Sequence, residues 1–303
     1  SGQGIAIDLV TVDDIMDNFG FGLYDPSAIG DFLKHSYENY PAPAPSAVLF
    51  VGDANYDFLD HLGTGVPNIV PAYVFEFDRT LSDDNYVYFG QYGLVDSDTS
   101  YFGGDRGFDM ISARWPVNSA GEINSIVAKI KSYESPNNFD SWRSNIALVA
   151  DDEYGANSPL IEAVHTYQTE NLSNNHIPDL LNKHKIYAWE YPFVNREKPA
   201  VNDAIVNDFN EGALVVNYVG HGSPDLWAHE HIFSRTADLP RLTNSAKLPL
   251  VYAASCAISF FDDPKREGMG EDLLSMSGGA AGVIASTRLV YSAENADFNS
   301  VVF

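Results

Sequence analysis

The stretch ALVVNYVGHGS, residues 213–223, and the stretch LPLVYAASC, residues 248–256, decide the fold of this chain. Each contains an apolar run of strand length that ends on small residues, which is typical of a buried strand in a parallel sheet. His221 follows the first run and Cys256 ends the second. Because ligands of open α/β sheets bind at the carboxyl ends of the strands, we expect these two side chains to share a site.

Outward from these two runs, apolar segments alternate with helical patterns along most of the chain. Helical spacing of apolar residues is clear over residues 119–134, and a helix is also predicted over residues 158–172. The pattern favours an α/β fold with mainly parallel sheets flanked by helices. Further strands are predicted over residues 5–10, 47–51, 108–113, 146–150, 185–190 and 281–286.

A Ser-Pro-Asn-Asn segment at residues 135–138 interrupts this alternation, and the strand–helix pattern begins again after it. We therefore predict two subdomains, an N-terminal α/β subdomain over residues 1–138 and a C-terminal catalytic subdomain over residues 139–303. The chain opens on a strand pattern and closes within an apolar segment. We expect it to be part of a longer protein with a prodomain or C-terminal domains.

The composition limits the class of protein and its partners. Of 303 residues, 45% are hydrophobic and 19% charged, as in a globular protein. The formal net charge of −25 argues against a nucleic-acid partner. It fits a secreted or cell-surface protein, a salt-rich habitat or carboxylate-built calcium sites, and composition does not separate these three. No apolar run is long enough to span a membrane.

Cys256 is the only cysteine, so an internal disulfide and a CxxC motif are both excluded. A lone cysteine is usually a buried small apolar residue, but beside an imidazole at a strand end it can become a nucleophilic thiolate. Glycines on both sides of His221 let the backbone approach a ligand. The N–H groups of Gly222 and Cys256 could then stabilise an oxyanion. The alternative is that His221 is simply a turn residue.

Residues 217–227, NYVGHGSPDLW, are similar to the catalytic histidine block of the gingipain-type (C25-like) cysteine peptidases. Residues 254–256, ASC, with the segments that follow them, resemble the nucleophile block of that family. The segments FDDP at 261–264 and TRLVYS at 287–292 resemble in particular the surface sortase branch that serves type IX secretion. The resemblance covers nearly the whole chain, since three upstream segments also fit: residues 51–57, 82–86 and 111–117.

The resemblance implies a caspase-like α/β fold in two subdomains. It implies that His221 is the general base and acid, that Cys256 is the nucleophile, and that the N–H groups of Gly222 and Cys256 form the oxyanion hole. In the family a carboxylate after the first strand of the second subdomain orients the histidine. Asp152 and Glu153 are the candidates here, and a solvated acidic loop is the alternative.

The sequence signals for substrate-binding and metal-binding residues are less specific than those for His221 and Cys256. Trp227 is a candidate for the wall of the primary specificity pocket, or else a core aromatic. Glu294 and Asp297 are candidate acidic pocket residues, or else surface residues. The chemistry needs no cofactor, but relatives bind calcium, so structural Ca²⁺ is expected, with ligands unknown. Candidate oxygen donors lie in a loop-rich segment: Asp83, Asp84, Asp96, Asp98 and Asp105.

Three functions remain open. The leading hypothesis is a secreted or surface cysteine endopeptidase, a thiol protease that hydrolyses protein or peptide substrates through an acyl-enzyme on Cys256. The second is a sortase-like transpeptidase that cleaves a C-terminal signal and passes the acyl group to a surface amine. The third is a non-catalytic surface module that keeps the fold.

Overall fold

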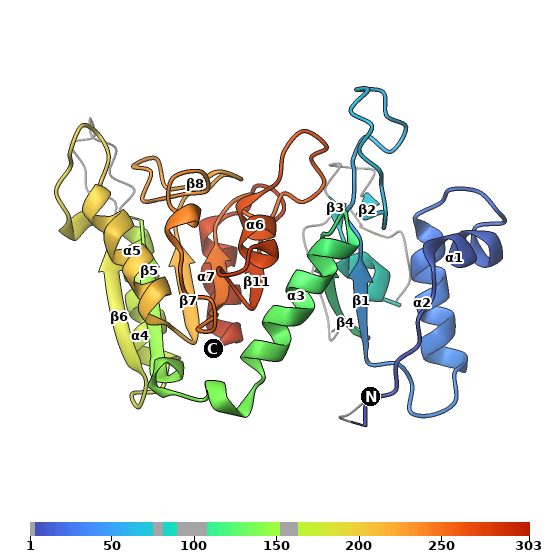
Figure 1. Ribbon diagram of the computed structural model, residues 1–303, viewed down its shortest axis with the longest axis horizontal. Helices are drawn as coiled ribbons and strands as arrows, with labels where there is room; N and C mark the ends of the chain where they lie inside the picture. Colours follow the sequence, from blue (N-terminus) through green and yellow to red (C-terminus); the bar gives the residue numbers. More distant parts are fainter. Residues whose placement is uncertain (1–3, 75–80, 90–107, 152–162) are drawn as a thin grey trace. The chain divides into compact units, whose positions relative to one another are not determined.

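The computed structural model describes residues 4–74, 81–89, 108–151 and 163–303 (Figure 1). The chain divides into two compact units, Ser1–Asn118 and Ser119–Phe303. The predicted boundary between residues 138 and 139 lies beyond helix α3 (Ala120–Tyr133), which opens the second unit. This helix is held there by Lys129, whose buried ammonium donates to two carbonyls at the end of helix α6 (Met269–Ser275).

The first unit contains a parallel pair of strands, β1 (Ala47–Val51) and β4 (Ile111–Trp115). Apolar residues of the two N-terminal helices share a buried cluster with β1. The prediction of a strand at residues 5–10 is wrong, since the structure has no strand there and Leu9 is 91% exposed. The other elements of this unit are α1 (Val12–Phe19), α2 (Ser27–Asn39), β2 (Tyr73–Val74), β3 (Leu81–Ser82) and the 3₁₀-helix η1 (Asp84–Val87).

The second unit is built on a five-stranded sheet in which every pairing is parallel. This confirms the predicted α/β fold. Strands of this kind are buried on both faces, which explains the continuous apolar runs of the sequence. In spatial order the strands are β11 (Gly282–Ala285), β10 (Leu250–Ala254), β7 (Val215–Val219), β5 (Asn145–Ala150) and β6 (Asn182–Tyr187).

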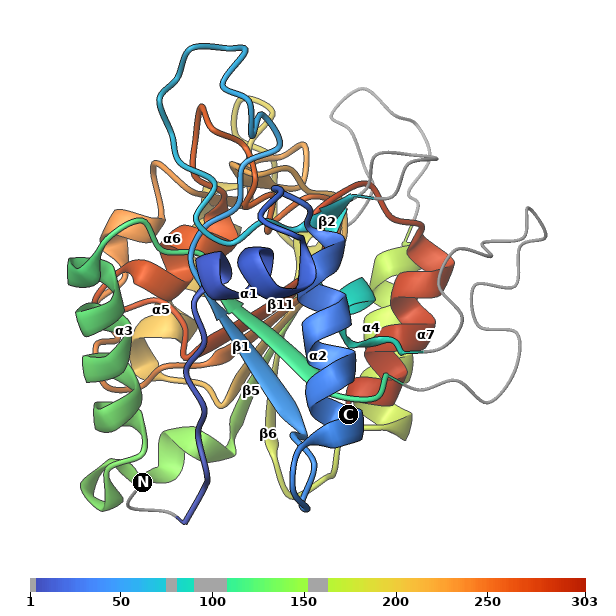
Figure 2. The same ribbon diagram turned by 90° about the vertical axis from the view of Figure 1, so that its right-hand side faces the viewer.

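Helices cover both faces of this sheet (Figure 2). Helices α4 (Val164–Asn175) and α7 (Ser292–Val302) contact each other and lie on one face. Helix α5 (Pro199–Glu211) lies on the other face with α6. After β6 the chain crosses back over β5 to form β7, so the strand order reverses between β5 and β7. Such a switch point opens a crevice at the carboxyl ends of the strands.

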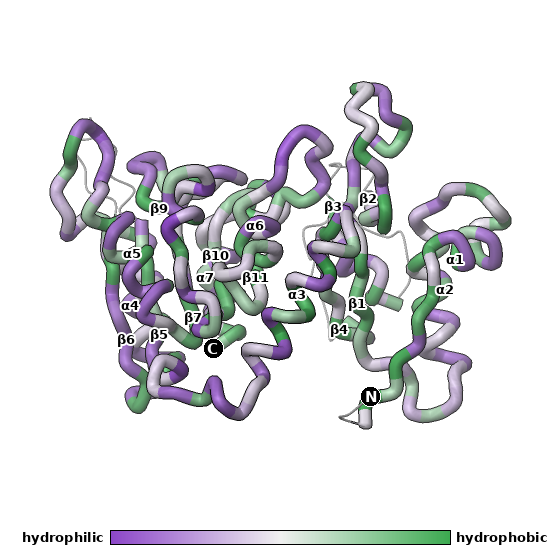
Figure 3. Tube along the Cα trace, viewed as in Figure 1, coloured by the Kyte–Doolittle hydropathy of each residue, from purple (hydrophilic) through white to green (hydrophobic). Residues whose placement is uncertain are grey.

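Most of the hydrophobic core of the second unit lies between the sheet and the helices α5 and α6. Val216 and Tyr218 of β7 pack there with Phe209 of α5 and Leu273 of α6, all almost without exposed surface. In Figure 3 strands β10 and β11 are coloured mainly as hydrophobic, whereas the edge strand β6 is coloured mainly as hydrophilic. Burial fixes the register of the three central strands, β5, β7 and β10. Among the described residues, no helix has the length and apolar character that a membrane span requires.

The second unit also contains two short strands and several 3₁₀-helices in the segments that connect its main elements. Strands β8 (Leu226–Trp227) and β9 (Phe233–Ser234) form an antiparallel pair in the segment that follows β7. The 3₁₀-helices are η2 (Pro136–Asn138), η3 (Ser141–Ser144), η4 (Ala188–Glu190) and η5 (Leu239–Arg241).

Candidate active site

The register of three neighbouring strands aligns the candidate residues. Val219 of β7 lies opposite both Ala150 of β5 and Ala254 of β10. The ladder continues one step further, because the N–H of Asp151 donates to the carbonyl of Val219 at 3.0 Å and the N–H of Gly220 to that of Ala254 at 3.3 Å. His221 and Cys256 each come two residues after these opposed positions, at the same edge of the sheet.

Gly222 lies directly against the segment that carries Cys256. A Cβ atom built at Gly222 would lie 2.3 Å from Oγ of Ser255 and 3.1 Å from the carbonyl oxygen of Cys256. Any side chain at position 222 would therefore collide with the segment. The structure thus brings the loop after β7 and the loop after β10 together, as the sequence predicted for strand ends.

Two backbone N–H groups at this junction are unengaged. Within the described part of the chain, neither Gly222 nor Cys256 donates its N–H in a hydrogen bond. The neighbouring Ser223 and Ala257, in contrast, donate theirs to the carbonyls of Leu226 and Arg288. Free backbone donors in the segment of a thiol and in the segment packed against it are what an oxyanion hole needs.

A buried carboxylate supports the backbone of His221. Asp151 has no exposed surface, and its Oδ2 accepts the backbone N–H of His221 at 3.2 Å. Gly220 is required beside it, since a Cβ there would lie 2.4 Å from Cβ of Asp151. Asp151 directly precedes the two candidates predicted from the sequence, Asp152 and Glu153, which lie outside the described residues. The end of β5 at Ala150 is the signal that marks Asp151.

The loop of His221 is also tied to the loop of Cys256 by charged side chains. The carboxylate of Asp225 accepts from Arg235 at 2.8 Å and from Arg266 at 2.9 Å. Arg235 donates in turn to Asp272 of α6 at 2.7 Å. These ion pairs are only partly buried, so each one contributes little by itself. Their value is that they join segments that follow two different strands.

The thiol of Cys256 is half-buried and faces the loop after β11. Its Sγ lies 3.5 Å from both the N and the O of Val290. The same loop is anchored by Arg288, which makes a bidentate ion pair with the buried carboxylate of Asp262 at 2.8 and 2.6 Å. The guanidinium of Arg288 also lies 4.2 Å from the ring centroid of Phe260. Ion pairs of this geometry are strong and directional.

The candidate substrate residues are placed differently from one another. Trp227 belongs to the core: it has no exposed surface and stacks on Tyr218, with ring centroids 4.3 Å apart. The pairing of β8 with β9 brings it against Phe233, as the core alternative predicts. Glu294 and Asp297 are exposed on α7, and their predicted contact with substrate stays a prediction.

The predicted calcium ligands are only partly described. Both oxygens of Asp83 accept from Arg114 at 2.6 Å, so this carboxylate already has a positive partner. Asp84 accepts from the hydroxyl of Ser112 at 3.2 Å. The guanidinium occupies the place of a cation at Asp83, whereas a calcium contact of Asp84 stays a prediction. The other three candidates, Asp96, Asp98 and Asp105, lie outside the described residues.

A second histidine lies beside His221. His165, on the first turn of α4, is 4% exposed and meets the ring of His221 at 5.5 Å. Burial, and then the charge of His221, lower the pKa of His165 to about 4. Nothing in the sequence relates two residues so far apart along the chain.

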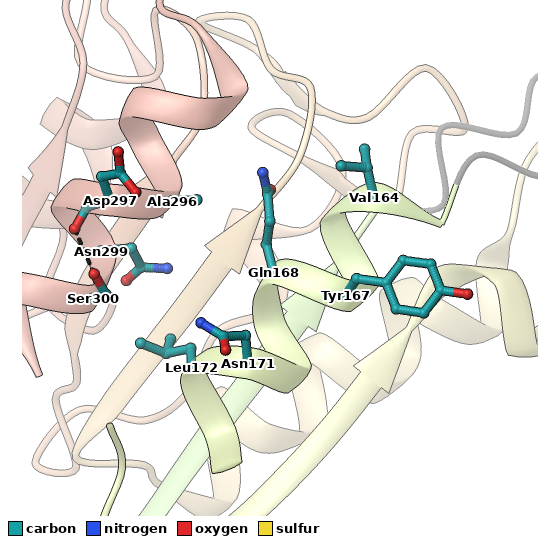
Figure 4. A pocket seen from close by; sticks show the side chains of 9 residues that line it. All are labelled: Val164, Tyr167, Gln168, Asn171, Leu172, Ala296, Asp297, Asn299 and Ser300. Atoms are coloured by element: carbon teal, nitrogen blue, oxygen red, sulfur yellow. Dashed lines mark hydrogen bonds between the residues drawn. The ribbon is translucent and has the colours of Figure 1, made fainter. Parts of the chain in front are cut away.

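A groove runs between α4 and α7 on one face of the sheet (Figure 4). Of the candidate residues described above, Asp297 lines it, and His221 and Cys256 do not. Its polar side chains come from both helices, with Gln168 and Asn171 on α4 and Asp297 and Ser300 on α7. The remaining lining residues are Val164, Tyr167, Leu172, Ala296 and Asn299.

Comparison with known proteins identifies one family. The model of peptidase family C25 matches residues 1–303. Gingipain R2 and gingipain R1 of Porphyromonas gingivalis are each 27% identical to the chain over 158 residues, which is 51% of this chain. The matches cover 20% and 14% of those two proteins, so the chain spans a fifth or less of the curated relatives it matches.

Solved structures agree on the fold. The crystal structure of the Arg specific cysteine proteinase gingipain R matches with a TM-score of 0.66 and 23% identity, covering 90% of this chain and 55% of that one. A complex of Porphyromonas gingivalis RgpB pro- and mature domains matches with a TM-score of 0.65 and 21% identity, covering 94% and 59%. These likenesses confirm the predicted gingipain-type α/β fold.

Replacing Gly222 by alanine should damage both stability and any activity. The new Cβ would collide with Ser255 Oγ, so we expect a loss of about 2 kcal/mol or more in the free energy of unfolding. Among the described residues the buried hydroxyl of Ser255 has no hydrogen-bond partner, so Ser255→Ala alone should cost under about 1 kcal/mol. Chemical denaturation of both variants and of the double variant measures the coupling.

The double variant Gly222→Ala/Ser255→Ala should recover part of the lost stability, because it removes the atom nearest to the added Cβ. Strict additivity of the two single effects would show that the two loops do not touch in this way.

His165 should make the protein sensitive to acid. Its folded-state pKa of about 4 lies below the ordinary 6.5, so the unfolded chain binds more protons between these two pH values. Stability is therefore lost as the pH falls from 6.5 towards 4, by about 3 kcal/mol at most. His165→Phe should flatten this slope, as measured by denaturation at several pH values, whereas the control His61→Phe should not. An unchanged slope in His165→Phe would contradict the assignment.

Proposed function

The chain belongs to peptidase family C25 and so to the cysteine-type peptidases, and we propose that it is an endopeptidase that acylates Cys256. His221 serves as general base and then as general acid. The observation that carries this proposal is that Gly222 and Cys256 each have an N–H group with no acceptor among the described residues, at the strand ends that also bear the imidazole and the thiol.

The reaction follows from the order of these groups. His221 takes the proton of the Cys256 thiol, and the thiolate attacks the carbonyl carbon of the scissile peptide bond. The N–H groups of Gly222 and Cys256 donate to the oxyanion that forms. The imidazolium then gives its proton to the leaving amine, and a thioester remains on Cys256. Water, deprotonated by His221, attacks the thioester and releases a carboxylic acid and the free thiol.

Asp151 acts in this scheme through the backbone. Its carboxylate accepts the N–H of His221, which holds the start of the glycine-flanked loop in place. The contribution of a further carboxylate to the His221 ring, from Asp152 or Glu153, remains part of the proposal. We also propose protein substrates and a secreted or surface location, in keeping with the net charge of −25.

Cys256→Ala should abolish peptide hydrolysis, and His221→Ala should lower kcat by about 10³-fold or more. His61→Ala is the matched control, since this exposed histidine lies in the other unit and should leave the rate unchanged. The assay is cleavage of a peptide library by each variant, with folding checked by thermal denaturation. Hydrolysis retained by Cys256→Ala would remove the proposal.

The same assay separates hydrolysis from transpeptidation. The thioester can be resolved by water or by an amine, and mass spectrometry of the products with and without an added amine identifies which of them reacts. Carboxylic-acid products alone, at high amine concentration, support the endopeptidase; amide products support the sortase-like alternative.

A further inference from the structure

The ring of His221 contacts two other histidine rings. His165 meets it nearly at right angles, with ring centroids 5.5 Å apart and planes at 86°. His229, in the loop that follows β8, approaches to 5.0 Å with planes at 51°. His165 is buried and His229 is exposed, so one contact comes from the protein interior and the other from the solvent side.

The interior contact is built on rigid elements. His165 is the second residue of α4, and its carbonyl accepts from the hydroxyl of Thr169, which is fully buried, at 2.8 Å. Helix α4 packs against β5 and β7, and β7 is the strand that delivers His221. The distance between the two rings is therefore set by helix-on-sheet packing. Sites held by helices and strands are more precise than sites held by loops alone.

His165 is uncharged at neutral pH, which is compatible with its place beside the ring of His221. Burial keeps it uncharged at neutral pH, so it presents no positive charge to the imidazolium that His221 becomes during the reaction. Other titratable groups in contact with His221 among the described residues are Asp151 and Tyr218 at its backbone and His229 at its ring. A neutral aromatic ring at position 165 can restrict the rotation of a neighbouring ring without opposing its protonation.

We propose that His165 is a positioning residue, whose ring holds the imidazole of His221 in the orientation that faces Cys256. The proposal rests on the proposed function, because it assigns His165 a role only through the general base. A ring that positions the base affects the chemical step. We therefore expect kcat to fall when the ring is lost, and KM to stay the same.

The test compares side chains at position 165 that keep or lose a flat ring. His165→Leu fills the space without a ring and should lower kcat by about 10-fold or more, because small displacements of catalytic groups are costly. His165→Phe should retain kcat within about threefold of the wild type, since the ring that positions His221 is kept. KM should change less than twofold in both. His165→Met supplies a second ring-free side chain in case the leucine variant does not fold.

A control separates positioning from loss of stability. Leu172→Val removes one buried methylene from the same helix, about two turns from His165, and should lower Tm without lowering kcat. Equal kcat in wild type and His165→Leu would overturn the proposal. So would a folded His165→Phe as impaired as His165→Leu, because the ring alone would then not suffice.

A second readout distinguishes this proposal from the proposed function. Alkylation by iodoacetamide reports on Cys256 alone, since it is the only cysteine. If the wild type cleaves peptides and Cys256→Ala does not, the proposed function stands whatever His165 does. Alkylation of His165→Leu at least about threefold slower than that of His165→Phe would then support the positioning role. Equal alkylation rates in these two variants would overturn it.

Discussion

The parallel register of β5, β7 and β10 is the constraint on which the candidate site depends. Ala150, Val219 and Ala254 are opposed across the three strands, so whatever follows them meets at one edge. Each strand is nearly buried on both faces, and a slip of one residue would reverse every side chain. The core of the second unit thus fixes the separation between the loop of His221 and the loop of Cys256.

Close backbone packing brings the loops that follow these strands into direct contact. Gly220 lies against Asp151, and Gly222 lies against Ser255, with no room for a Cβ at either position. The two glycines let three chain segments approach at a sheet edge where side chains would otherwise separate them. Among the residues described, the N–H groups of Gly222 and Cys256 are unengaged, and they belong to two segments that this packing brings together. Ion pairs through Asp225 and Arg288 then hold the outer parts of these loops.

Much of the fold could be predicted from the sequence, because buried parallel strands leave continuous apolar runs. The runs ending at His221 and Cys256 became β7 and β10, and the strand order makes them neighbours. A local alternation at residues 5–10 was misleading, since a strand also needs a partner that the pattern does not reveal. The two-unit division falls before α3 because Lys129 attaches that helix to α6, a contact between residues far apart in the sequence.

The site was predicted only in part, for similar reasons. Asp151 stands first in a run of three acidic residues, and only the end of β5 tells it apart from the others. Trp227 is the last residue of the segment that resembles the histidine block, yet the pairing of β8 with β9 buries its side chain in the core. His165 could not be foreseen, because its contact with His221 depends on how α4 packs on the sheet.

The most direct test of the account is a crystal structure of the protein after reaction with a peptidyl chloromethyl ketone. We predict a thioether at Cys256 Sγ, the peptide carbonyl oxygen within about 3 Å of the N–H groups of Gly222 and Cys256, and a ring nitrogen of His221 at hydrogen-bond distance from the reacting atoms. A label on another residue, or an imidazole out of reach of the labelled sulfur, would contradict the account.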